Sequence, residues 1–73
     1  MTAFEAPLFF SPTDARQWVY HQSLAEHIYL CRVRHENDGR SYDLFHFYND
    51  EELECITQGE PSIREWEILE SWH

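Results

Sequence analysis

The chain has 73 residues, and its fourteen acidic side chains face five arginines and no lysine, which gives a net charge of -9. Nucleic acids and anionic membranes bind basic surfaces, so this charge excludes both as direct ligands and favours a basic protein as partner. The same acidity could also serve solubility alone. The length allows one small domain, whose bulk comes from three Trp, four Tyr and five Phe.

Residues 1–10 are predicted to form an extended arm, because Pro7 interrupts an apolar run. This segment has no positive region, so we expect neither a secretory signal nor a membrane span. Only two cysteines occur, Cys31 and Cys55, which is typical of a reducing cytoplasm. We expect residues 11–73 to form a single domain.

A helix is predicted over residues 12–24. Ser11 is a suitable cap, Pro12 suits the first helical position, and Asp14 places negative charge in the first turn. The positions of one helix face are Ala15, Trp18, Val19 and Gln22, of which the last is polar.

Two strands are predicted, over residues 27–35 and 41–48, on either side of Asn37-Asp38-Gly39. A two-residue turn at Asp38-Gly39 places Arg34 opposite Asp43, Arg32 opposite Phe45 and Leu30 opposite Phe47. The first pair can form an ion pair and the second a cation–π contact. Both faces of this hairpin are rich in apolar residues, which indicates cover on both sides or one side left for a partner.

A second helix is predicted over residues 50–58, capped by Asn49 and ended by Gly59. Residues 62–72 fit either a strand or a helix, and we favour a strand because an isolated hairpin is only marginally stable. The fold class is therefore α+β: a small antiparallel three-stranded sheet, made of the central hairpin and a C-terminal strand, with two short helices.

No catalytic, cofactor or metal site is predicted. Glycine-rich phosphate loops, nucleophile elbows and paired cysteines at zinc spacing are absent from the sequence. The alternative is a structural zinc, whose ligands would come from Cys31, His35, His46 and Cys55. We expect a protein that is not an enzyme and that acts without a cofactor or a metal.

Small size, missing lysine, many aromatic residues and strong acidity together resemble small acidic bacteriophage host-takeover proteins. The chain is most similar in character to the transcription regulators of Xanthomonas lytic phages. This resemblance implies an inhibitor that binds a bacterial RNA polymerase subunit and blocks initiation, with displacement of the sigma factor. Two other classes remain open: an acidic anti-CRISPR or DNA-mimic inhibitor of a host nuclease complex, and an antitoxin-like binder of a small basic protein.

The expected partner-binding residues are of two kinds, in a protein expected to be a monomer. Aromatic and arginine side chains are the commonest interface anchors, and acidic side chains steer the encounter. The anchor candidates are Phe9, Phe10, Arg32, Arg34, Tyr42 and Tyr48, and the steering candidates are Asp50, Glu51, Glu52 and Glu54. The alternative for the arm is that it packs back over the hairpin and contributes only stability.

Overall fold

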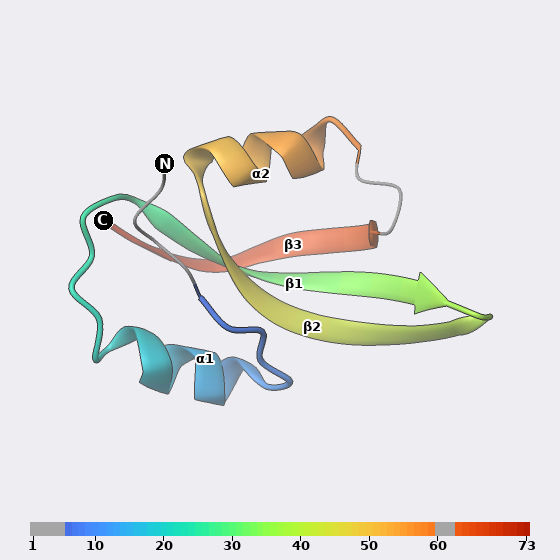
Figure 1. The fold of residues 1–73 in the computed structure, drawn as a ribbon, viewed down its shortest axis with the longest axis horizontal. Coiled ribbons are helices and arrows are strands. Elements are labelled where there is room, and N and C mark those ends of the chain that lie inside the picture. The colour runs from blue at the N-terminus through green and yellow to red at the C-terminus, as the bar shows by residue number, and fades with distance from the viewer. Residues whose placement is uncertain (1–5, 60–62) are drawn as a thin grey trace.

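The computed structural model describes residues 6–59 and 63–73. Two short helices enclose a three-stranded antiparallel sheet, which confirms the expected α+β class (Figure 1). The elements in chain order are α1 (Pro12–Val19), β1 (Ile28–Asn37), β2 (Arg40–Asn49), α2 (Asp50–Thr57) and β3 (Ile63–Trp72). The sheet order is β2-β1-β3, so β1 is central and the ambiguous C-terminal segment is a strand.

The hairpin of β1 and β2 forms with the predicted register. Arg34 lies opposite Asp43, and Leu30 lies opposite Phe47. Asp38 and Gly39 both have positive φ, 53° and 75°, which is the signature of a type I′ turn. At the turn, β1 ends two residues later and β2 begins one residue earlier than predicted, because this tight turn lets pairing continue up to Asn37 and Arg40. At the other end, β1 begins at Ile28, one residue later than predicted, and β2 ends at Asn49, one residue later than predicted.

The third strand contains a bulge that changes which side of the sheet its residues face. On one side of the bulge Leu30 pairs with Glu70, and on the other side Cys31 pairs with Ile68, so Leu69 is an extra residue. Trp72 therefore packs on one face of the sheet and Trp66 on the other. A uniform period of two would have placed both on one face.

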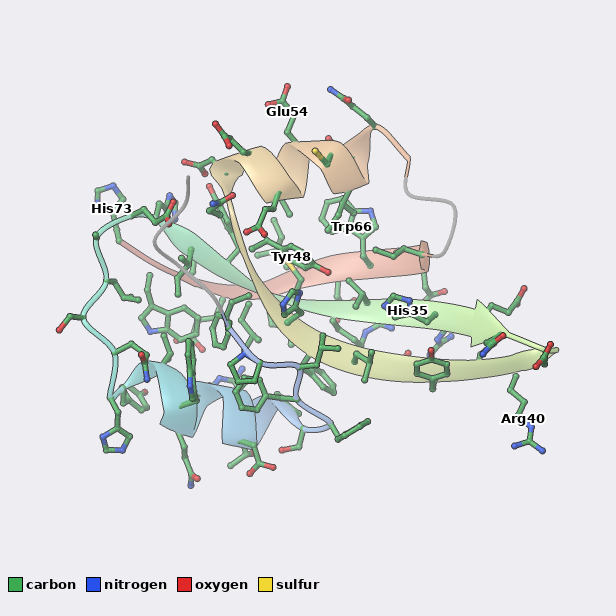
Figure 2. All side chains as sticks on the ribbon, viewed as in Figure 1. His35, Arg40, Tyr48, Glu54, Trp66 and His73 are labelled. Atoms are coloured by element: carbon green, nitrogen blue, oxygen red, sulfur yellow. The ribbon has the colours of Figure 1, made fainter. Side chains whose placement is uncertain are left out.

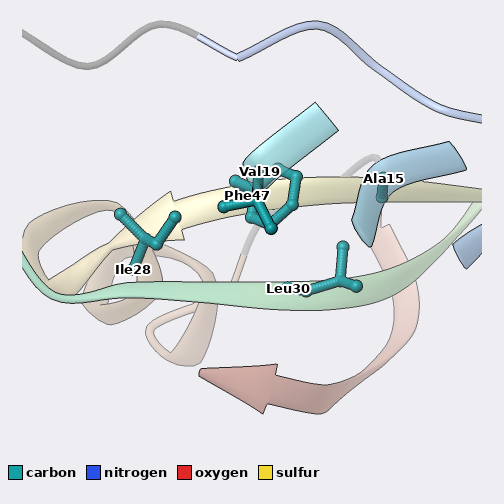
Figure 3. Close-up of a cluster of buried hydrophobic side chains, with 5 residues drawn as sticks. All are labelled: Ala15, Val19, Ile28, Leu30 and Phe47. Atoms are coloured by element: carbon teal, nitrogen blue, oxygen red, sulfur yellow. The ribbon is translucent and has the colours of Figure 1, made fainter. Parts of the chain in front are cut away.

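The two helices cover opposite faces of the sheet (Figure 1). We call these the α1 face and the α2 face. The cluster on the α1 face has a fully buried centre made of Ala15, Val19, Ile28, Leu30 and Phe47 (Figure 3). The cluster on the α2 face has Cys31, Val33 and Leu44 at its centre, with Leu53 of α2 and Trp66 packed against it. Of the two alternatives for the hairpin faces, cover on both sides is the one that the structure has.

Helix α1 is shorter than predicted, which corrects the range 12–24. Its last helical residue is Val19, and His21 and Gln22 then bond to the carbonyls three residues before them. The Gln22 side chain also donates to the Trp18 carbonyl, at 3.3 Å. Gln22 lies at a position of the predicted helix face, but it is polar and exposed. A further helical turn would therefore bury no apolar side chain at this position.

Helix α2 begins at a complete capping box. The Asn49 side chain accepts from the Glu52 N–H at 2.9 Å, and the Glu52 carboxylate accepts from the Asn49 N–H at 3.0 Å. Gln58 is the C-cap, and Gly59 follows with a φ of 103°, a conformation that suits glycine. The predicted range 50–58 is thus one residue too long.

The end of the arm is joined to the edge of the sheet. The N–H and the carbonyl of Phe9 both bond to Phe45 of β2, each at 2.9 Å. The Phe9 ring packs between Trp18 and Phe47, with centroid distances of 5.9 Å and 6.2 Å. The backbone of Phe9 therefore extends the sheet beside β2, and its side chain adds to the cluster on the α1 face.

Candidate interaction surface

Arg16, Arg32 and Arg34 lie on the α1 face, where carboxylates neutralise them. Arg16 of α1 pairs with Glu70, with 2.8 Å between Nε and Oε1. Arg32 and Arg34 of the central strand share three carboxylates from both neighbouring strands. These are Asp43 of β2 and Glu65 and Glu67 of β3. This network crosses the sheet from β2 to β3.

The tightest pair in this network is the predicted one between Arg34 and Asp43. The Arg34 Nε donates to Asp43 Oδ1 at 2.8 Å and its second nitrogen donates to Oδ2 at 3.2 Å. This forked contact holds the pKa of the Asp43 carboxyl below its ordinary value. Arg32 lies opposite Phe45 as predicted, but its guanidinium pairs with Asp43, Glu65 and Glu67.

Both arginines are therefore engaged inside the protein. The side chain of Arg32 is 19 % exposed and that of Arg34 is 40 % exposed. A partner that took either arginine would have to break ion pairs that already exist, so these two candidates are poor anchors.

The outer side of α2 carries acidic side chains that have no arginine partner in the described part of the chain. All four steering candidates are exposed, and Glu54 points away from the sheet (Figure 2). Glu52 is used in the capping box, and Asp50 accepts a hydrogen bond from the Tyr29 hydroxyl at 2.7 Å. Glu51 and Glu54 are the two whose carboxylates have no internal task among the described contacts.

The remaining anchor candidates do not form one patch. Phe9 is half-buried in the α1 cluster, whereas its neighbour Phe10 is 83 % exposed. Tyr42, near the turn, is 45 % exposed and stacks on His35 with 5.7 Å between ring centroids. Tyr48 is half-buried on the α2 face, beside the His46 ring at 4.7 Å.

The hairpin tip extends past both helices (Figure 1). A shallow hollow of about 500 Å³ at this tip is lined by Asn37, Asp38, Arg40 and Tyr42. Arg40 is exposed and points away from the rest of the protein (Figure 2). Sequence reasoning named Tyr42 here but not Arg40, although a polar turn residue at a projecting tip is a recognisable signal.

The four residues of the alternative zinc site differ in their surroundings. Cys31 is fully buried and Cys55 is exposed. Burial raises the pKa of the Cys31 thiol to about 12, which disfavours the thiolate that a metal needs. Within residues 6–59 and 63–73, no group of three or more His, Cys, Asp or Glu side chains is placed to hold a metal ion.

A second hollow brings Asp50, a predicted steering residue, together with residues that sequence reasoning missed. It lies where the approach to β1, the start of α2 and the end of β3 meet, and its lining includes Glu26, His27, Asp50 and His73. No sequence signal points to it, because these residues come from three separate segments. Chemically, the surfaces described here suit binding: an acidic helix, an exposed hairpin tip and two open hollows.

Comparisons of the chain with protein-family models, with curated proteins and with solved structures each gave no match. Over the described residues, no helix is long and apolar enough to cross a membrane. The surfaces themselves are therefore the basis for a function.

Proposed function

We propose that this protein is a phage-type inhibitor that binds bacterial RNA polymerase by a protein–protein contact and so blocks transcription initiation. The partner presents a basic surface to α2. The observation that carries the proposal is the separation of charge: the ion-paired arginines of α1 and β1 lie on the α1 face, and the acidic side chains of α2 have no arginine partner among the described contacts.

Separated charge of this kind favours a basic partner on one side of the molecule. Carboxylates that no internal cation neutralises attract a basic surface over a Debye length of roughly 8–10 Å at ordinary salt. Such attraction raises the association rate more than it lengthens the lifetime of a complex. Polymerase offers such surfaces where it holds nucleic acid, and occupying one of them would interfere with initiation.

Affinity capture tests the identity of the partner. We expect the tagged protein to retain polymerase subunits from a bacterial lysate and purified protein to inhibit transcription from a sigma-dependent promoter. A nuclease complex or a single small basic protein as the retained species, with transcription unaffected, would refute the proposal in favour of the anti-CRISPR or antitoxin class.

A pair of charge-matched variants tests the surface. Glu51→Gln with Glu54→Gln removes two unpaired charges from α2, and we expect a several-fold slower association with polymerase and a weaker dependence on salt. Glu65→Gln with Glu67→Gln removes the same charge from the α1 face and serves as the control. Equal slowing by both double variants would show that only the net charge matters and that α2 is not the contact.

A further inference from the structure

The hollow at the start of β1 is open and is built from three separated parts of the chain. Its volume is about 340 Å³. Its walls are Leu24, Ala25, Glu26 and His27 from the segment before β1, Asp50 from the first turn of α2, and His73 after β3. His73 projects from the molecule at this end (Figure 2).

The rings of His27 and His73 line this hollow, and the Tyr29 ring packs against His27 behind them. The His27 ring lies 4.3 Å from the Tyr29 ring, with 34° between the planes, and 5.1 Å from the His73 ring, with 62° between the planes. The Tyr29 hydroxyl donates to Asp50 Oδ1 at 2.7 Å and lies 3.3 Å from His27 Nδ1. The hydrogen bond from Tyr29 thus ties these rings to the Asp50 carboxylate.

Two carboxylates line the same space, and neither has an arginine partner in the described part of the chain. Glu26 is half-buried and has no hydrogen bond or ion pair among the described residues. Among the described contacts, the side chain of Asp50 accepts only the neutral hydroxyl of Tyr29, on one oxygen. A half-buried carboxylate is less well solvated than one at the surface, so a cation that enters the hollow gains more from it.

We propose that this hollow binds an arginine side chain of a basic protein partner. Carboxylates attract either kind of basic side chain, but the flat rings select the guanidinium. A guanidinium stacks on aromatic planes and offers forked donors to carboxylates, whereas an ammonium is a compact and strongly hydrated charge. This inference rests on the proposed function for the partner, but the chemistry of the hollow is testable without polymerase.

The direct test uses a small probe, N-acetyl-arginine methylamide, added to the isotope-labelled full-length protein and followed by NMR. We expect saturable shifts that centre on Glu26, His27, Asp50 and His73, with a dissociation constant of about 10 mM or below. The citrulline analogue has the same shape and no charge, so it should not bind. The lysine analogue should bind at least several-fold more weakly.

Matched variants test which carboxylates take part. Asp50→Asn should weaken the arginine probe several-fold, whereas Glu51→Gln removes the same charge one residue away, outside the hollow, and should have little effect. Glu26→Gln should also weaken binding of the arginine probe several-fold. Because Glu26 lies outside both helices, this result does not depend on whether Asp50→Asn disturbs α2. A well-dispersed spectrum confirms that each variant is folded.

Three outcomes would overturn this inference: no saturable shift, equal binding of the citrulline or lysine analogue, or equal weakening by Asp50→Asn and Glu51→Gln. If the arginine probe does not bind but polymerase is still captured, the hollow is not an arginine site and the proposed function is unaffected. Selective probe binding without polymerase capture would keep the hollow and remove polymerase as partner.

Discussion

Phe9 and Phe10 are adjacent in sequence and have opposite surroundings, so they form a matched pair. Phe9→Ala removes a ring from between Trp18 and Phe47, and we expect it to lower the free energy of unfolding by about 2 kcal/mol. Phe10→Ala removes a ring that is 83 % exposed and should change stability by less than about 0.5 kcal/mol. Urea denaturation measures both.

The same pair decides the role of the arm. If Phe9→Ala leaves the urea midpoint unchanged, the contact of the arm with the sheet contributes no stability. Phe10→Ala is the variant with which to ask whether the arm also contacts a partner, because its effect on binding is not mixed with unfolding.

The two cysteines should differ in reactivity. Thiolates react with alkylating reagents and thiols do not, and burial raises the pKa of the Cys31 thiol to about 12. At pH 8 we therefore expect iodoacetamide to modify only the exposed Cys55 in the folded protein and both cysteines in urea. Mass spectrometry of digested protein locates the modification. Rapid modification of Cys31 under native conditions would mean that the core under α2 opens readily.

At the scale of single elements, α2 depends on its capping box. Asn49 is 3 % exposed and satisfies the Glu52 N–H at the start of the helix. Asn49→Ala should cost about 1–2 kcal/mol of stability, because it leaves that donor without its partner. Asn49→Ser can still accept the bond and should cost less. Thermal unfolding followed by circular dichroism distinguishes them, and equal losses would mean that the cap is unimportant.

Local signals were enough to predict the elements of the fold. The dipeptide Asp38-Gly39 fixed the turn, and through it the whole register of β1 and β2. The end of α1 and the bulge at Leu69 were not predicted. Both depend on packing against the sheet, which a pattern along the chain does not contain.

The candidate surfaces were predictable only in part. The acidic run before Cys55 was visible because its residues are consecutive. Part of the arginine network was predicted from the sequence. The hairpin register gave the pair of Arg34 and Asp43, but it could not place Glu65 of β3 beside Arg34. The arginine hollow was not visible, since it depends on where the ends of the strands come together.

At the scale of the whole molecule, stability should fall on mild acidification because of His46. Burial lowers the pKa of His46 below its ordinary value of 6.5, so the folded state resists a proton that the unfolded state accepts. The sign follows from linkage: stability is fullest above pH 6.5 and declines as the pH falls toward the lowered pKa. We expect His46→Gln to flatten this decline.

The control for this prediction is His21→Gln, which removes an imidazole from an exposed position after α1. Urea midpoints measured between pH 7.5 and about 5 give the slope for each protein. If the parent and His46→Gln lose stability equally over this range, the acid sensitivity comes from other groups.

The bulge in β3 lets a single strand contribute to both hydrophobic clusters. Trp72 belongs to the cluster under α1 and Trp66 to the cluster under α2, so one ten-residue strand is anchored in both. Detachment of this strand from the sheet would expose both clusters at once, so neither cluster would stay intact without it. β1 and β2 also supply residues to both clusters, and the inserted Leu69 lets β3 do the same. Loss of Leu69 would turn one of the two indoles to the wrong side of the sheet.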